Sequence, residues 1–536
     1  MVDKIKEAVK KATGKELGEV VVPERSEFGD YSTNAPFLWA KALKMSPLEI
    51  AKEAAEKIKE ADADRLFSKV EAAPPGFINF WISKNALIKE LVKILNFPSS
   101  LKLRKGKQKI CLEFISANPT GPVTMANGRG GFLGDTLANV LETAGHSVTR
   151  EYYINDAGNQ IKTLGESILA ALGKAPAKEE HYQGEYVKEI AKELARKIKP
   201  KNSPEEIGRL ATTIFIKQAK KSIEKIGVKF DVWFSEFKKL RGAKGLNFLV
   251  LSLLKQKGLV VEHDGAQWLQ SGDIADPLRP GPSEASEKDR VLVKSDGQPT
   301  YFLSDLAYHY DKFFRRRFDL AINIWGADHH GYVARLKSGV KALGVNPDRL
   351  QILVTQLVRL VENGQEVRMS KRTGEFITLD ELIKDVGADA TRFFFLMYTP
   401  DTHMDFDLNL AKEKSLKNPV YYAQYAYVRC LSILKKAKGI KGIGLENLSS
   451  ENDLAVIKEL IRWPEIVRQT AMDYQVSRLT RYALELARTF HNFYEKERVI
   501  TEDQTLTRAR LALVAAAKTI FERLFKLIGI SAPKKM

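Results

Sequence analysis

The sequence has only two cysteines, Cys111 and Cys430, in 536 residues, and no apolar run long enough to cross a membrane. Two cysteines argue against a disulfide framework and against a cysteine-ligated zinc site. A transmembrane helix needs about 20 predominantly apolar residues, so we expect no membrane-spanning segment. The N-terminal stretch is amphipathic and carries acidic residues, unlike a secretory signal. We therefore expect a cytoplasmic protein.

Internal repeats and low-complexity segments are also missing. The composition, with 44% hydrophobic and 28% charged residues, is that of an ordinary globular protein. The length predicts roughly three domains. The formal net charge of +18 favours a polyanionic partner such as a nucleic acid, although lysine-rich solubility is an alternative explanation.

The most informative stretch begins with a short apolar run at 110–115, which predicts a buried strand. Two prolines and a glycine within 116–122 predict a loop. From about Gly130 the apolar residues fall on one helical face until Gly145, and 148–154 predicts a second strand. This unit predicts the opening of a doubly wound parallel sheet, which binds ligands where the first strand meets its helix.

The N-terminus of this helix would suit a phosphate, but two common phosphate-binding signatures are absent. G-x-x-x-x-G-K-[ST] does not occur, and Gly-Arg-Gly at 128–130 begins like G-x-G-x-x-G but has Leu133 in place of the last glycine. The loop instead resembles the first signature, HIGH, of class I aminoacyl-tRNA synthetases in its arginyl-tRNA synthetase version. The resemblance rests on Asn-Pro-Thr-Gly-Pro at 118–122, on Gly-Arg-Gly and on Asp-Ala-Gly-Asn-Gln at 156–160.

Neither histidine of the HIGH motif is present. In that family the histidines donate hydrogen bonds to ATP phosphates; Thr124 and Asn127, at the matching positions, can still donate, but uncharged and with shorter reach. The resemblance implies that these two residues act in catalysis. It also implies an ATP-binding loop made of Pro119, Thr120, Gly121, Pro122, Val123, Thr124, Met125, Ala126, Asn127 and Gly128.

A second signature follows at 367–374, where Val-Arg-Met-Ser-Lys-Arg-Thr-Gly resembles the KMSKS motif of the same class. Taken alone, Met-Ser-Lys is common by chance and predicts a solvated loop. The resemblance implies that Arg368, Ser370 and Lys371 are catalytic and that Met369 and Lys371 contact ATP. Cations on such a loop would neutralise the charge that builds on the leaving pyrophosphate.

The run at 299–309 suits the recognition of a guanidinium. If Thr300 caps a helix, then Tyr301, Asp305 and Tyr308 share one face. A carboxylate framed by aromatic rings offers bidentate hydrogen bonds and stacking, although Asp305 could equally pair with a lysine of the protein. The resemblance implies that Tyr301 and Asp305 hold the side chain of L-arginine.

The same resemblance assigns the head group of the amino acid to Glu113, Ser116 and Asn118. Another apolar strand, at 320–326, ends in Gly-Ala-Asp-His-His. A metal site is disfavoured there, because two adjacent histidines rarely reach one ion and no third ligand is apparent. Class I synthetases bind adenosine at this strand end, and the residues implied here are Gly326, Asp328 and His329.

The resemblance covers nearly the whole chain and predicts a multidomain α/β protein. Residues 1–100 would form a small α/β tRNA-binding domain, 101–409 a Rossmann-like catalytic domain with a helical insertion at about 161–239, and 410–536 a helical anticodon-binding domain. Phe77 and Asn79 could stack on and bond to an unpaired base, or be core and local cap. The implied tRNA contacts are Phe77, Asn79, Tyr425, Arg429, Arg478, Arg481 and Met536.

These patterns predict an arginyl-tRNA synthetase. It would convert ATP and L-arginine to arginyl-adenylate and transfer the arginyl group to the 3'-terminal adenosine of tRNA(Arg), with Mg²⁺ bound to ATP and no protein-bound metal. The family implies that activation requires bound tRNA, and we expect a monomer. Two alternatives are a catalytically silent relative that only binds tRNA, and an ATP-dependent nucleotidyltransferase that does not use tRNA.

Overall fold

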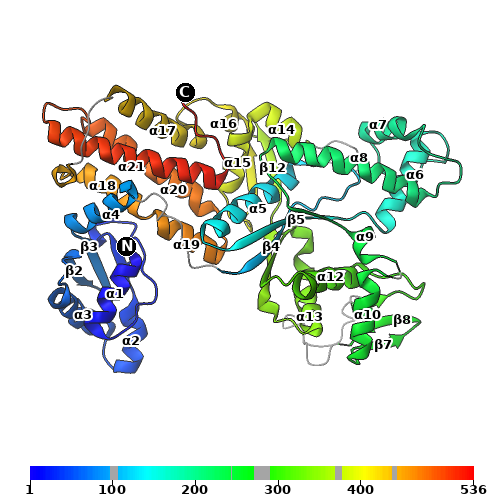
Figure 1. Cartoon of the computed structure of the whole chain (residues 1–536), viewed down its shortest axis with the longest axis horizontal. Coiled ribbons are helices and arrows are strands. Elements are labelled where there is room, and N and C mark those ends of the chain that lie inside the picture. Colours follow the sequence, from blue (N-terminus) through cyan, green and yellow to red (C-terminus); the bar gives the residue numbers. More distant parts are fainter. Residues whose placement is uncertain (97–106, 243, 271–289, 368–376, 438–443) are drawn as a thin grey trace. The chain divides into compact units, whose positions relative to one another are not determined.

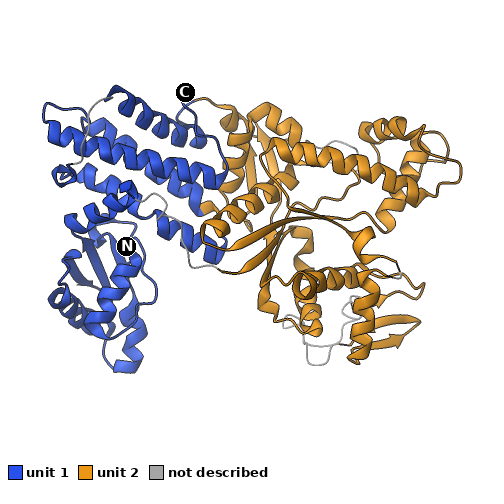
Figure 2. Cartoon of the chain, in the orientation of Figure 1, with its two compact units in different colours: residues 1–103, 415–474, 478–536 blue, residues 104–414, 475–477 orange. Residues whose placement is uncertain are grey.

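The computed structural model describes residues 1–96, 107–242, 244–270, 290–367, 377–437 and 444–536. The chain divides into two compact units (Figure 2). The first contains residues 1–103, 415–474 and 478–536, and the second contains 104–414 with 475–477. Among the described residues, no helix combines the length and the apolarity needed to cross a membrane.

The second unit is built on a parallel sheet of five strands in the order β11-β10-β4-β5-β6. The apolar runs at 148–154 and 320–326 lie in this sheet, and so do the first four residues, 110–113, of the run at 110–115. The strands are β4 (Lys109–Glu113), β5 (Ser147–Ile154), β6 (Val232–Ser235), β10 (Leu320–Gly326) and β11 (Leu350–Thr355).

Helices cover both faces of this sheet, as a doubly wound fold requires (Figure 1). Helix α5 (Met125–Thr143) packs on one face, and α12 (Tyr301–Tyr310) and α13 (Val333–Leu343) pack on the other. The predicted fold class and the strand–loop–helix–strand unit are therefore confirmed.

The prediction that the first helix starts near Gly130 was wrong, because α5 begins at Met125. Its first turns contain glycines instead of an apolar stripe, so hydrophobic periodicity cannot reveal them. The glycines are required by close packing against the sheet and the following helix. A Cβ on Gly134 would lie 2.2 Å from the ring of Phe114, and one on Gly128 would lie 2.8 Å from Leu379.

The insertion between β5 and β6 consists of α6 (Asn159–Ala171), α7 (Glu185–Leu194) and α8 (Pro204–Lys225). Its own apolar core includes Leu164, Ile190 and Phe215. Helices α6 and α8 cross so closely that there is no room for a side chain at Gly165. A Cβ on this residue would lie 1.8 Å from the Pro204 carbonyl oxygen. The backbones therefore meet without intervening side chains.

Two smaller sheets complete the second unit. One has the order β7-β8-β9 and the other β13-β12-β14. The remaining strands are β7 (Val260–His263), β8 (Ala266–Leu269), β9 (Val291–Val293), β12 (Val358–Glu362), β13 (Gln365–Glu366) and β14 (Met404–Asp407). The remaining helices are α9 (Glu236–Leu240), α10 (Leu246–Gln256), α14 (Leu379–Val386), α15 (Ala388–Leu396) and α16 (Leu408–Lys412).

The first unit joins the two ends of the chain. Its N-terminal part is an antiparallel sheet of order β1-β3-β2, namely β1 (Tyr31–Thr33), β2 (Phe67–Ala73) and β3 (Phe77–Ile82), with α1 (Val2–Thr13), α2 (Ala35–Leu43), α3 (Pro47–Ala61) and α4 (Lys84–Asn96). Its C-terminal part is the helical bundle α17 (Pro419–Lys436), α18 (Glu451–Ile461), α19 (Trp463–Asp473), α20 (Ser477–Lys496) and α21 (Gln504–Ile528). Lys458 of the bundle forms an ion pair of 2.7 Å with Asp30 of the N-terminal part.

Replacing Gly208 by alanine should destabilise the insertion. The new Cβ would lie 1.9 Å from the Ile161 carbonyl oxygen, so the helices must separate. Overpacking should lower the free energy of unfolding by about 1–3 kcal/mol. The higher helix propensity of alanine should raise it by about 1 kcal/mol. The urea midpoint followed by far-UV circular dichroism should fall. Gly331→Ala, whose Cβ would meet nothing within 4 Å, is the control, and an equal midpoint in both variants would contradict the packing argument.

Candidate active site

The candidate site lies at the carboxyl edge of the parallel sheet, where strand order reverses between β4 and β10. From β4 the chain runs through α5 to β5 on one side, while β10 pairs with β4 on the other side. Ligands of such sheets bind in the crevice that this reversal opens. Glu113 ends β4 and Gly326 ends β10, so two of the predicted site segments meet at this edge.

The turn after β4 holds two of the three predicted head-group residues, Ser116 and Asn118. Ile115 and Ser116 have φ angles of 65° and 38°, a strained region for such residues. This turn directs the Ser116 hydroxyl to donate to Glu113 at 3.1 Å and to accept the Tyr153 N–H at 3.0 Å. Asn118 is exposed, and its side-chain oxygen accepts from Asn155 at 3.3 Å. Two consecutive residues at the predicted amino-acid site thus have a strained backbone.

The four residues in place of HIGH form the start of α5. Thr124 is its N-cap, and the Asn127 side-chain oxygen accepts both the Thr124 N–H at 3.0 Å and the Thr124 hydroxyl at 2.9 Å. The expectation that both side chains are available donors therefore needs correction, because the Thr124 proton is used within the loop. The Asn127 amide nitrogen remains as the side-chain donor of a partly exposed residue.

The second signature, with Arg368, Met369, Ser370 and Lys371, lies outside the described residues. Its flanks are well defined. Before it, the Val367 N–H donates to the Leu360 carbonyl at 2.9 Å. After it, the Ile377 carbonyl accepts the Met125 N–H at 3.1 Å, and Leu379 N–H donates to Val123 at 3.0 Å. The segment that follows the second signature is therefore bonded directly to the N-terminus of α5.

Asp305 lies on α12, which Thr300 caps as expected through a bond to the Leu303 N–H at 3.3 Å. The hydroxyl that donates to Asp305 is that of Tyr332, at 2.6 Å, which the sequence did not predict. The Tyr308 hydroxyl instead donates to Glu151 at 2.5 Å. Burial raises the pKa of Asp305 to about 7 despite the bond from Tyr332. Such a carboxyl group is poised to ionise when a cation arrives.

Glu236 is a second acid, close enough for its charge to raise the pKa of Asp305, and sequence reasoning missed it. Its side chain is 1% exposed at the carboxyl end of β6, the same edge of the sheet. Asp156 fixes it from both sides by accepting the Ser235 hydroxyl at 2.6 Å and the Phe237 N–H at 2.8 Å. Burial, followed by the charges of Glu236 and Asp305, raises the pKa of Tyr153 well above its usual value. The rule applied to 326–330, that functional side chains follow strand ends, could have found Glu236.

A buried lysine lies beneath the pocket. Lys312 is fully buried and donates to Glu113 at 3.0 Å and to the Asn323 side-chain oxygen at 2.9 Å. Burial alone would lower the pKa of Lys312, but the charges of Glu113 and Glu151 leave it raised. Sequence analysis left open that Asp305 pairs with a lysine of the protein. Lys312 instead pairs with Glu113.

Asn323 extends this network to His309. Burial lowers the pKa of His309 to about 3, so the ring is neutral. Its Nδ1 lies 2.7 Å from the Asp305 carbonyl oxygen, which only accepts, so Nδ1 carries the proton. Nε2 then accepts from the Asn323 amide at 3.0 Å, which turns the amide oxygen towards Lys312. Each hydrogen bond from the Asp305 carbonyl through His309 and Asn323 to Lys312 therefore joins a donor to an acceptor.

The predicted adenosine residues lie in the open part of the site. Asp328 and His329 are exposed, with His329 Nε2 3.6 Å from the Asp328 carboxylate, and a Cβ on Gly326 would lie 2.7 Å from that carboxylate. Within the described ranges, no three His, Cys, Asp or Glu side chains are grouped to hold a metal ion.

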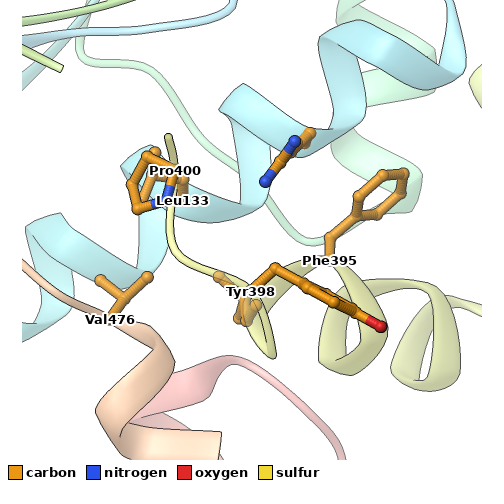
Figure 3. A pocket seen from close by; sticks show the side chains of 7 residues that line it. Leu133, Phe395, Tyr398, Pro400 and Val476 are labelled. Carbon is orange, nitrogen blue, oxygen red and sulfur yellow. The ribbon is translucent and has the colours of Figure 1, made fainter. Parts of the chain in front are cut away.

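A small cavity of about 10 Å³ lies beside Arg129 (Figure 3), room for a single water molecule at most. It is lined also by Leu133, Phe395, Leu396, Tyr398, Pro400 and Val476. The buried Arg129 guanidinium donates to the carbonyls of Gln356, Thr399 and Thr402 at 2.7–2.9 Å. This arginine of the Gly-Arg-Gly run therefore supports α5 and does not face a substrate.

The predicted tRNA residues of the N-terminal part are placed differently from one another. Phe77 is partly exposed and packs edge-on against Phe37 at 5.7 Å. Asn79 is only 3% exposed and accepts the Ser32 hydroxyl at 2.7 Å from the neighbouring strand β1, so its amide oxygen holds two strands together and is not the local cap of the alternative interpretation. Phe80 is fully buried.

In the helical bundle, Tyr425 and Arg429 belong to an aromatic cluster instead of standing free. The Arg429 guanidinium lies 4.1 Å from the ring centroid of Tyr494 and 4.8 Å from that of Tyr425, and His491 stacks on Tyr425 at 5.8 Å. Arg478 is paired with Asp473. Arg481 and Met536 are exposed.

Comparisons with known proteins cover the whole chain. The family model "Arginyl tRNA synthetase N terminal domain" matches residues 1–82, "tRNA synthetases class I (R), catalytic domain" matches 90–395, and "DALR anticodon binding domain" matches 423–536. The arginine–tRNA ligase of Carboxydothermus hydrogenoformans is 42% identical, over 97% of this chain and 94% of its own. That of Staphylococcus carnosus is 40% identical, over 100% and 98%.

Solved structures agree with this fold. The arginyl-tRNA synthetase of Thermus thermophilus aligns over all of both chains with a TM-score of 0.79 at 21% identity. A putative arginyl-tRNA synthetase from Campylobacter jejuni has a TM-score of 0.74 at 29% identity, and the alignment covers 85% of this chain and 100% of that chain.

Replacing Lys312 by methionine should destabilise the protein by about 3–5 kcal/mol, because the Glu113 carboxylate and the Asn323 oxygen lose their cation in a buried place. The double variant Lys312→Met, Glu113→Gln should recover much of this loss, since no unpaired charge remains. Urea unfolding measures both, and Lys341→Met, at an exposed position of α13, is the control. A double variant as unstable as the single one would refute this account of the pair.

Proposed function

Because the chain belongs to the arginyl-tRNA synthetases, we propose that it activates L-arginine with ATP and transfers the arginyl group to the 3'-terminal adenosine of tRNA(Arg). The observation that carries this proposal is the cluster of buried acidic side chains at the sheet edge. Asp305 and Glu236 are its two carboxylates, and Tyr301 and Tyr153 flank them. Such a pocket attracts a cation that can also stack on aromatic rings.

The pocket favours a guanidinium over an ammonium. Arginine's planar fork can bond to two carboxylates at once, whereas an ammonium is a compact point charge. Lysine or ornithine would leave one of the two acids unpaired in a buried place, which is costly. The substrate's head group would then lie towards Glu113, Ser116 and Asn118.

ATP would lie across the carboxyl edge of the sheet. Its phosphates suit the N-terminus of α5, where the helix dipole favours anions, although the Met125 N–H there is already bonded to the Ile377 carbonyl. The Asn127 amide nitrogen can donate to the phosphates from this loop. The adenosine would reach Gly326, Asp328 and His329, and Mg²⁺ would be carried on the ATP phosphates.

Activation needs no side-chain nucleophile. The arginine carboxylate oxygen forms a bond to the α-phosphorus, and the bond from that phosphorus to pyrophosphate breaks. Catalysis then consists of positioning and of neutralising charge on the leaving group. We assign the second task to Arg368 and Lys371, and the attachment of Ile377 to Met125 supports this assignment, because it ties the end of their segment to the phosphate site.

The two parts of the first unit would bind the tRNA. We propose three domains with the boundaries 1–100, 101–409 and 410–536, in which the first and third contact tRNA(Arg). In the bundle, the cluster of Tyr425, Arg429, Tyr494 and His491 offers faces on which nucleobases could stack. We further propose that the protein works as a monomer in the cytoplasm.

Arginine-dependent exchange of pyrophosphate into ATP tests the activity, run with and without tRNA(Arg). We expect exchange only when tRNA is present, as in the family. The result would show that the Asn127 amide and the α5 N-terminus serve where HIGH histidines usually do. Absence of exchange under both conditions, in a folded protein that still binds tRNA, would favour the catalytically silent relative.

Arginine binding should depend on pH through Asp305. In the free protein its pKa is about 7, and burial is the main cause. A bound guanidinium requires the ionised form, so binding releases a proton below this pKa and none above it. The dissociation constant should rise about tenfold for each pH unit below 7 and stay level above it. Calorimetric titration of the wild type and of Asp305→Asn measures this; a slope that survives in the variant would exclude Asp305 as its source.

A further inference from the structure

The pocket contains a guanidinium that belongs to the protein. Arg241 follows α9, and its Nε and Nη2 lie 2.9 and 2.5 Å from one oxygen of Glu236. The Glu236 side chain is 1% exposed and that of Arg241 is 18% exposed, so this ion pair is part of the pocket wall and not a surface contact. A pair so desolvated is worth more than an exposed one.

The carboxylate that Arg241 occupies is the one that the substrate needs. The Ser304 hydroxyl, one residue before Asp305, lies 3.5 Å from the same Glu236 oxygen. Arg241 Nη2 and the Tyr301 hydroxyl lie 3.9 and 3.7 Å from the point where a Cβ on Gly158 would stand. Arg241 therefore lies among the groups assigned to the arginine side chain.

We propose that Arg241 is an internal competitor, whose guanidinium substrate arginine displaces from Glu236 as it binds. The proposal rests on the proposed function, because it requires the substrate to pair with this carboxylate. Glu236 would exchange one guanidinium for another of the same geometry, so its buried charge stays paired before and after binding. Arg241 would swing out from a chain turn that contains Gly242, at a φ of 83°.

Competition of this kind weakens the binding of every ligand that must displace Arg241. Apparent affinity falls by the fraction of molecules in which the carboxylate is free. Two charge-assisted hydrogen bonds to one carboxylate oxygen keep that fraction at about a tenth or less.

Calorimetric titration of arginine into the wild type, Arg241→Gln and Arg241→Lys tests the proposal. Arg241→Gln should bind arginine about tenfold more tightly or better, and Arg241→Lys should lie between it and the wild type. Lys239→Gln removes a charge from the exposed face of α9 and should bind like the wild type. In exchange assays with tRNA, the KM for arginine should fall in Arg241→Gln, while the KM for ATP stays unchanged and kcat does not rise.

Equal or weaker arginine binding in both Arg241 variants would overturn the proposal and make Arg241 a positioning residue for Glu236. A Glu236→Gln background separates the two roles further, because there the Arg241→Gln change should no longer tighten binding; tightening that persists would also overturn it. Failure of the wild type to bind arginine at all would overturn the proposed function instead, so the two failures are distinguishable.

Discussion

The buried ion pair between Lys312 and Glu113 is the interaction on which the rest of the site depends. It joins the segment after α12 to the end of β4, and through Asn323 it also holds β10. A cation in such a place is tolerable only when every donor finds an acceptor. The continuation to His309 and the Asp305 backbone fixes the tautomer of the ring and the orientation of the amide. The floor of the pocket is therefore rigid, while the charged groups above it, Asp305 and Glu236, are left for exchange with ligands.

Much of this architecture follows from the sequence. Short apolar runs predicted the strands of the parallel sheet, a period-3.6 pattern predicted its first helix, and the Thr300 cap predicted where α12 begins. The start of α5 escaped because glycines, whose role is close packing, carry no periodic signal. The structure brings Glu113, Ser116 and Asp305 to one edge, as the signatures implied.

What the sequence could not provide were contacts between segments distant in the chain. Tyr332 bonds to Asp305 and Asp156 orients the strand end that bears Glu236, and neither pairing leaves a local trace. For Asn79, a contact with a ligand was predicted where the protein makes an internal one. The sequence suggested base recognition, but the Asn79 amide oxygen is buried and accepts the Ser32 hydroxyl. Side chains of one chemical type serve ligands or the protein itself according to burial, which becomes visible only in three dimensions.

The glycine crossing of α6 and α8 limits how this insertion can change in evolution. Gly165 and Gly208 each face a main-chain carbonyl of the opposite helix, and not a side chain. Most close contacts can be relieved by a compensating substitution on the partner, which makes pairs of positions covary. A peptide oxygen is identical for every amino acid, so no partner substitution can make room here. Among related sequences, each of these two positions should be conserved as glycine whatever residue the opposite helix carries, and the two positions should show little covariation.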